Sequence, residues 1–315
     1  MSSIFTSAVS LLTNSIMPAI WTTTKAIAVF LLLINIKTLP LTWHFRFYRS
    51  LIYHFFVRRT ITPAPAHLFS PITTTSRAST YECDLNGHKS NSTYFSDLDI
   101  ARTHLVCHLT KSSFKTRRLR GDPVMYVALA GVTALFRREI PPFTKYEISS
   151  RVLGWDRKWV FVSSHFVSLE KNKKTGEKTI YASCLSKYVF KSGRMTVPPE
   201  LVFQESGLVP ARPEGAEEME GFGGSSGVET PVQGLKEGKM GEEKLEAVMR
   251  KMVKEDLERN VQKDDGYWTW ERVEEERKRG LATAQGMIAL DGLDAEFREG
   301  TEEGLEKVGR FFGAI

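Results

Sequence analysis

One amphipathic helix limits the folds open to this chain of 315 residues. Five apolar side chains recur at spacings of four, three, four and four, which places them on one face of a helix: Tyr94, Leu98, Ala101, Leu105 and Leu109. A helix with such a stripe has to bury it against another element. We therefore expect a helix that begins near Asn91 and packs against a sheet.

The segments after this helix have the composition of strands. Residues 123–136, 143–153, 158–169 and 178–190 are rich in apolar, β-branched and aromatic side chains. The second and third segments flank the turn-like run 154–157, which predicts a hairpin. A further short run, 79–83, precedes the helix and is also strand-like. One helix enclosed by curved antiparallel strands gives an α+β fold, in the order strand, helix, four strands.

The turn between the strand-like run and the helix carries the strongest functional signal. Asp84 stands at the end of the run, four residues before His88. The N-terminus of a helix offers unpaired N–H groups and a partial positive charge, which polarise a carbonyl group while a nearby carboxylate attacks it or activates water. Asp84 is the candidate base or nucleophile. The N–H groups near Gly87 and the helix start at Asn91 are the candidate oxyanion donors.

The same residues resemble a known family. The pattern D-x3-H-x2-N-x2-Y in Asp84, His88, Asn91 and Tyr94, followed by F-x-D-x-D-x-A-R, is similar to the 4-hydroxybenzoyl-CoA thioesterase-like hotdog proteins. Within them it most resembles the membrane-anchored thioesterase superfamily member six group and its fungal thioesterase-like relatives. The block 137–162 resembles the central hairpin of that group, and the whole resemblance covers roughly residues 78–204.

This resemblance implies a hotdog domain over residues 79–204 that hydrolyses an acyl thioester of CoA or of a carrier protein. It implies no metal or other cofactor. It also implies a homodimer with the site at the subunit interface. Tyr94 and Asp97 are then candidates for contacting substrate, and Asp97 and Asp99 are reserve candidates for the catalytic acid, since some hotdog thioesterases carry it on the central helix.

Several alternatives stay open at this point. Asp84 is either catalytic or a carboxylate that caps the turn, and Tyr94 is alternatively a core aromatic. His88 is either an acid–base group, because its ordinary pKa is near neutral, or a residue that holds the turn by hydrogen bonding. The whole protein is alternatively an inactive hotdog that binds lipid or acts as a scaffold at a membrane.

The N-terminal region is basic and apolar. No acidic residue occurs before Glu82, while seven cations do: Lys25, Lys37, Arg46, Arg49, Arg58, Arg59 and Arg77. A net charge of +6 that is concentrated there indicates a membrane or a targeting signal rather than nucleic acid. We expect residues 1–59 to form a membrane anchor with a span over 16–36 and a basic interfacial segment, and residues 60–78 to form a linker.

The positive-inside rule places the following domain in the cytosol, and we expect the endoplasmic reticulum membrane. A cleaved signal peptide and a mitochondrial presequence are the alternatives. At the other end, residues 205–243 are rich in Gly and Glu and predict a linker. Residues 244–315 predict helices that either pack back on the domain or bind a partner. Three widely spaced cysteines suggest a reducing compartment.

Overall fold

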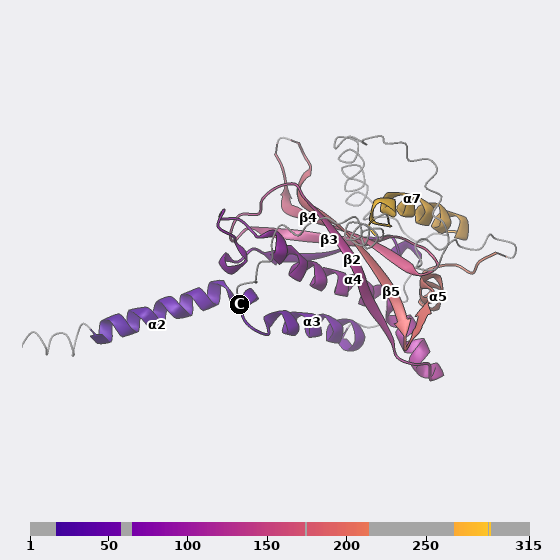
Figure 1. Ribbon diagram of the computed structural model, residues 1–315, viewed down its shortest axis with the longest axis horizontal. Coiled ribbons are helices and arrows are strands. Elements are labelled where there is room, and N and C mark those ends of the chain that lie inside the picture. The colour runs from indigo at the N-terminus through magenta and orange to yellow at the C-terminus, as the bar shows by residue number, and fades with distance from the viewer. Residues whose placement is uncertain (1–16, 58–64, 174, 214–267, 289, 291–315) are drawn as a thin grey trace, which may run out of the picture.

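The protein is described by a computed structural model over residues 17–57, 65–173, 175–213, 268–288 and 290 (Figure 1). Within these residues one antiparallel sheet has the order β1-β3-β4-β5-β2, with the short β6 paired to β5. The strands are β1 (Ile72–Arg77), β2 (Met125–Phe136), β3 (Lys145–Trp155), β4 (Trp159–Lys171), β5 (Lys178–Ser192) and β6 (Met195–Val197). The four strand-like segments predicted after the helix, including the hairpin, are confirmed.

The predicted central helix is α4 (Asn91–Arg120). All five residues of the stripe are at most 2% exposed, and their neighbours in the core come from β3, β4 and β5. Ser90 precedes the helix as its N-cap, so Asn91 is the first helical residue rather than the cap. Gly121 ends α4 with a φ of +80°, a left-handed conformation that favours glycine. A long helix against a curved antiparallel sheet is the predicted hotdog arrangement.

Two short elements before α4 differ from expectation. The run predicted as a strand forms a 3₁₀ turn, η5 (Thr80–Glu82), because the Glu82 carboxylate accepts hydrogen bonds from Ser79 and closes a capping box. The first strand, β1, lies instead at 72–77, inside the range predicted as a linker, and it pairs with β3 along its whole length. The strand reads Ile-Thr-Thr-Thr-Ser-Arg, and with a single apolar residue it left no apolar–polar alternation in the sequence.

Further helices cover the remaining faces. α3 (Thr42–Ile52) and the π-helical turn η3 (Tyr53–Val57) pack on α4, as does α5 (Pro199–Glu205), while α7 (Trp270–Ile288) packs on β3 at the opposite face of the sheet (Figure 1). At that contact a Cβ on Gly280 would lie 1.6 Å from the Leu153 carbonyl oxygen, so only glycine fits. The predictions for residues 214–267 and 291–315 fall outside the described residues.

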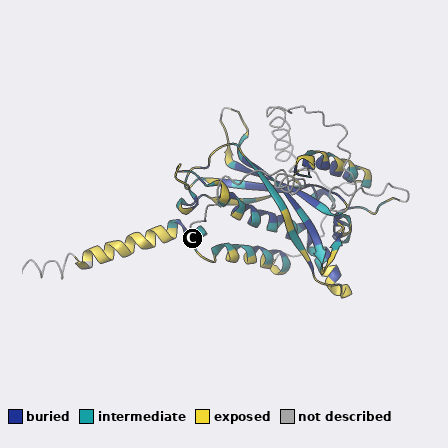
Figure 2. Cartoon of the chain, viewed as in Figure 1, coloured by how far each residue is buried: buried dark blue, intermediate teal, exposed yellow. Residues whose placement is uncertain are grey.

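The N-terminal helix α2 (Met17–Ile34) projects from the domain with nearly all its residues exposed (Figure 2). Among the helices that the structure describes, none is both long enough and apolar enough to cross a membrane. The span expected over residues 16–36 is therefore not supported. A bilayer core needs about 20 mostly apolar residues, whereas α2 has 18 and includes Lys25 and three threonines.

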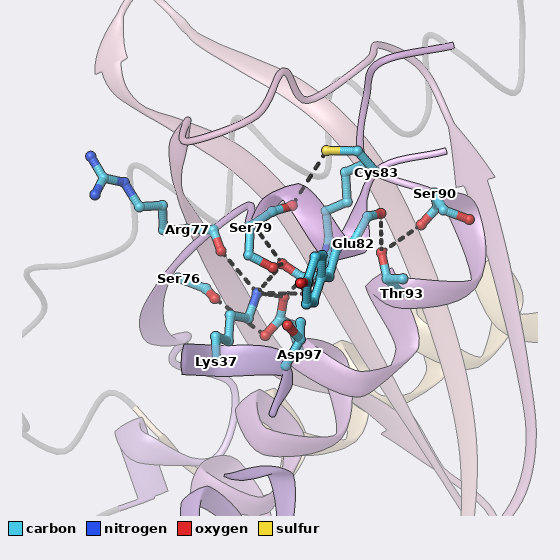
Figure 3. Close-up of polar contacts among 12 residues, drawn as sticks. Lys37, Ser76, Arg77, Ser79, Glu82, Cys83, Ser90, Thr93 and Asp97 are labelled. Atoms are coloured by element: carbon cyan, nitrogen blue, oxygen red, sulfur yellow. Dashed lines mark hydrogen bonds and ion pairs between the residues drawn. The ribbon is translucent and has the colours of Figure 1, made fainter. Parts of the chain in front are cut away.

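The next part of the N-terminal region belongs to the folded domain. Asp97 of α4 has a fully buried side chain, and its carboxylate contacts three cations, of which Figure 3 shows Lys37. Its oxygens lie 2.6 Å from Lys37 Nζ, 2.9 Å from Arg46 Nη2 and 3.3 Å from Lys89 Nζ, and Tyr146 donates its hydroxyl hydrogen to the same group. Lys37 comes from the turn η2 (Ile36–Thr38) and Arg46 from α3, so the predicted anchor supplies two of these three cations.

Glu82 is the second carboxylate of this group. Its oxygens lie 2.8 Å from both Lys37 Nζ and Lys89 Nζ, and Glu82 is 4% exposed. We call Lys37, Arg46, Glu82, Lys89, Asp97 and Tyr146 the buried charge cluster. Each member compensates the desolvation of another, which is the condition for burying ionised groups.

The stability that this cluster contributes depends on pH, because Asp97 has to be ionised to form the ion pairs. Burial opposes the charged form of Asp97, but Lys37, Lys89 and Arg46 outweigh burial and hold the pKa of Asp97 below its ordinary range. Burial lowers the pKa of Lys37, although Asp97 and Glu82 act in the opposite direction. A depressed carboxyl pKa means that these ion pairs contribute stability above the unfolded-state pKa of about 3.9. That contribution is lost as the pH falls through the lower folded-state value.

We predict that Lys37→Met destabilises the protein by about 1.5–3 kcal/mol, the usual worth of hydrogen bonds to charged groups. Urea unfolding at neutral pH measures the change. Lys25→Met is the matched control, since Lys25 is exposed on α2 and contacts only the face of Trp21 among its described interactions; surface changes of this kind stay within about 0.5 kcal/mol. Equal unfolding midpoints for the two variants would show that the cluster does not hold the N-terminal segment.

Candidate active site

The turn that carries Asp84 is a short hairpin between η5 and α4. Cys83 and Lys89 form an isolated antiparallel bridge at its base, and the Asp84 N–H donates to the His88 carbonyl over 3.0 Å. The Gly87 N–H donates to the Asp84 carbonyl, also over 3.0 Å. Gly87 has a φ of +75°, so the turn requires a residue without a side chain there. The sequence D-L-N-G-H therefore folds locally into one defined conformation.

Asp84 lies at the surface of this turn, with its side chain 34% exposed. Its Oδ1 accepts a hydrogen bond of 2.9 Å from the Asn86 N–H, and the same oxygen lies 3.8 Å from His88 Nδ1. The carboxylate thus closes the turn and also reaches solvent. Both roles considered for Asp84 are compatible with this position.

His88 lies between two carboxylates. Its Nδ1 faces Asp84, and its Nε2 lies 3.4 Å from Glu139 Oε1. Glu139 belongs to the segment between β2 and β3, and sequence reasoning did not single it out. The only signal was its place in the block 137–162 that resembles the family hairpin, because no local pattern pairs residue 139 with residue 88.

The expected oxyanion donors are placed as follows. Gly87 uses its N–H within the turn, and Asn91 is exposed at the first position of α4. The Ser90 side chain makes no capping hydrogen bond to the helix, while its carbonyl accepts a 3.0 Å hydrogen bond from the Thr93 N–H. The Gly87 N–H is therefore already used inside the turn. The start of α4, which lies directly after the turn, offers the remaining candidate donors.

Two of the other candidates, Tyr94 and Asp97, lie inside the domain. Tyr94 is 2% exposed, its ring packs edge-on against Phe136 and Phe166, and burial raises its pKa. Asp97 is enclosed by the buried charge cluster. Asp99 is partly exposed and forms an ion pair with Arg102. The structure thus brings Asp84, His88 and Glu139 together, and places Tyr94 and Asp97 in the core.

An apolar pocket lies further along α4, between the helix and the sheet. Its lining includes Leu105, Leu109, Val152, Val162, Phe190 and Phe203, and none of the candidate site residues. Across the described ranges, no group of three or more His, Cys, Asp or Glu side chains is arranged to hold a metal ion.

This arrangement can perform acid–base or nucleophilic chemistry at a carbonyl group. Asp84 supplies a solvent-reachable carboxylate, His88 supplies an imidazole beside it, and the N-terminus of α4 supplies a partial positive charge. These are the groups that hydrolysis of an activated acyl group requires.

Comparison with known proteins gives matches to thioesterase-like proteins. The sequence model of the Thioesterase-like superfamily matches residues 78–203. Thioesterase poxG of Penicillium oxalicum is 37% identical, over 90% of this chain and 88% of its own length. Probable thioesterase atnL of Emericella nidulans is 41% identical, over 59% and 72%.

A shorter match is to a member of the thioesterase superfamily member six group, which the turn motif resembles. Protein THEM6 of Xenopus laevis is 32% identical, over 29% of this chain and 41% of its own. Together these matches confirm the resemblance first recognised in the residues from Asp84 to Arg102. The chain belongs to the Thioesterase-like superfamily.

Proposed function

We propose that this protein hydrolyses an acyl thioester and that Asp84 is its catalytic carboxylate. The observation that carries this proposal is the placement of Asp84, one-third exposed, in a rigid turn directly before the N-terminus of α4. The names of the relatives, thioesterase poxG and probable thioesterase atnL, support the same reaction class.

The chemistry follows from the groups present. As a general base, Asp84 takes a proton from water, whose oxygen adds to the thioester carbonyl carbon while the start of α4 stabilises the developing oxyanion. The C–S bond then breaks, and the leaving thiolate takes the proton. As a nucleophile, Asp84 forms an acyl anhydride first, which water hydrolyses to return the free carboxylate.

Asp97 and Asp99 suit this role less well. Three cations and a tyrosine hydroxyl occupy the Asp97 carboxylate, and its side chain is fully buried. Asp99 is paired with Arg102, which also donates to Ser186. Because the Asp97 carboxylate is both paired and buried, it can neither meet water nor reach a carbonyl carbon. Asp99 reaches solvent as Asp84 does, with side chains 39% and 34% exposed, but Asp99 is held in an ion pair with Arg102 within α4. Asp84 instead lies in the turn directly before the N-terminus of α4.

The substrate class is an acyl-CoA or an acyl-carrier protein, and the reaction needs no cofactor or metal. A second candidate function is binding of a lipid without hydrolysis. The exposed apolar surface of α2, which lies outside the candidate site, is the observation that favours it. Hydrolysis assays with the full-length chain separate the two functions.

The assembly that we propose is a homodimer formed through β2. This 12-residue strand is an edge of the sheet, and it exposes Tyr126 and Leu129 at 50% and 43%. A long apolar edge strand is a template for pairing with another chain. In hotdog families such pairing commonly builds the site from both subunits.

We further propose that the protein resides at a membrane, with its folded domain on the cytosolic side and the endoplasmic reticulum preferred over the mitochondrion. The support is the exposed apolar surface of α2, which includes Trp21, Phe30 and Leu33, and the absence of acidic residues before Glu82. Apolar side chains beside cations favour the interface of an anionic bilayer.

We predict that Asp84→Asn lowers thioesterase turnover by about a hundredfold or more, the usual worth of a positioned acid–base group. The amide keeps the shape of the side chain and its bond to the turn, but it cannot accept a proton. The measurement is hydrolysis of acyl-CoAs of graded chain length by the full-length protein.

Asp122→Asn is the matched control, because Asp122 pairs with Arg120 beyond the far end of α4. It should leave turnover unchanged. Full activity in Asp84→Asn would remove Asp84 from catalysis, and no hydrolysis in the wild-type chain would favour the lipid-binding function.

For the dimer, Leu129→Lys should convert the protein to a monomer, since a charge on an edge strand opposes pairing. Leu201→Lys is the control, because Leu201 is similarly exposed, at 42%, but lies on the helix α5 and not on the edge strand. Light scattering at micromolar concentration gives the mass. A wild-type monomer would reject the dimer.

For the membrane, Phe30→Asp should weaken binding to anionic vesicles roughly tenfold or more, because a buried Phe contributes about 1.5–3 kcal/mol. Met195→Asp, on an exposed residue of β6, should not. Co-sedimentation of the full-length chain measures the difference, and fractionation of a tagged chain with mitochondria would contradict the preferred organelle.

A further inference from the structure

The segment between β2 and β3 is fixed next to the turn that carries Asp84. The N–H groups of Arg137 and Arg138 donate to the Tyr181 carbonyl of β5 over 2.7 and 3.0 Å. On the other side, the Ile140 carbonyl accepts a 2.9 Å hydrogen bond from the Lys89 N–H, and the Ile140 side chain is fully buried in the core. Glu139 lies between these attachments, so its backbone has a defined position relative to His88.

The Glu139 carboxylate itself is largely exposed, at 74%, while the His88 side chain is 21% exposed. An ion pair or hydrogen bond this exposed contributes little to stability. Its effect is instead on the orientation of the imidazole. Each ring nitrogen of His88 faces a carboxylate, Nδ1 toward Asp84 and Nε2 toward Glu139. A ring that carries hydrogen on both nitrogens donates toward both carboxylates, and this fixes its orientation.

We propose that Glu139 is a positioning residue of the active site, which fixes the ring of His88 through Nε2 so that Nδ1 is presented to the Asp84 carboxylate. This inference rests on the proposed function, in which Asp84 is catalytic. His88 then limits the rotation of Asp84 while the carboxylate meets water or the thioester carbonyl. Glu139 acts through His88 and touches no reacting atom.

The kinetic test compares Glu139→Ala with Glu139→Gln in the full-length protein. Loss of the acceptor in Glu139→Ala should lower kcat by between about tenfold and a hundredfold, as expected when a reacting group is slightly misplaced. KM should change less than about twofold, because substrate binding is untouched. Glu139→Gln keeps an acceptor oxygen and should restore most of the activity.

A double-mutant cycle tests the route through His88. If Glu139 acts only on that ring, Glu139→Ala should have no further effect in a His88→Ala background. Additive losses would overturn the proposal. Glu275→Gln is the matched control, since Glu275 is an exposed carboxylate paired with Arg272 on α7, and it should leave kcat unchanged.

A spectroscopic test does not depend on activity. With ¹⁵N-labelled histidine, the His88 signals are assigned by their loss in His88→Gln, and they report which ring nitrogen carries hydrogen. The wild-type protein should show hydrogen on Nε2, and Glu139→Ala should change this pattern. An unchanged His88 spectrum would overturn the inference even if Asp84→Asn is inactive; an active Asp84→Asn would remove the proposed catalytic role and leave the His88–Glu139 contact to be judged by the spectrum.

Discussion

The buried charge cluster around Asp97 is the interaction on which the rest of the structure depends. Its members come from η2, α3, η5, α4 and β3, together with Lys89 at the end of the turn. Figure 3 shows how Lys37, Glu82 and Asp97 converge. Glu82 directly precedes the Asp84 turn and Lys89 directly follows it, and the two side chains meet at 2.8 Å. The cluster therefore clamps both ends of the turn that presents Asp84, while Asp84 itself stays at the surface.

Burying the charged side chains of Glu82, Lys89 and Asp97 costs desolvation energy, and buried ion pairs often contribute little net stability. We infer that the value of the cluster lies in specificity. A displaced Lys37 or Arg46 would leave Asp97 with an uncompensated buried charge, so the N-terminal segment has one favourable position on α4. The separation into an exposed helix α2 and a domain-bound segment from η2 onward follows from this pairing.

Much of the fold could be predicted from local patterns. The apolar stripe of α4 and the hairpin of β3 and β4 have periodicities that depend on neighbouring residues alone, and both were predicted. β1 was missed because an edge strand with one solvated face needs few apolar residues. Glu82 was missed as a structural residue because its partners, Lys37 and Lys89, lie 45 and 7 residues away. Glu139 was missed for the same reason, since contacts between distant residues leave no local signal.

The close approach of Gly280 to Leu153 limits which surface of the sheet another copy of this protein can contact. With no side chain between them, the backbone of α7 rests directly on that of β3, and the outer face of the sheet around β3 is sealed. Sheets of this kind can associate back to back only where that face is bare. Here α7 occupies the position beside β3, so two copies cannot stack their sheets at this place, and any assembly has to use a different surface.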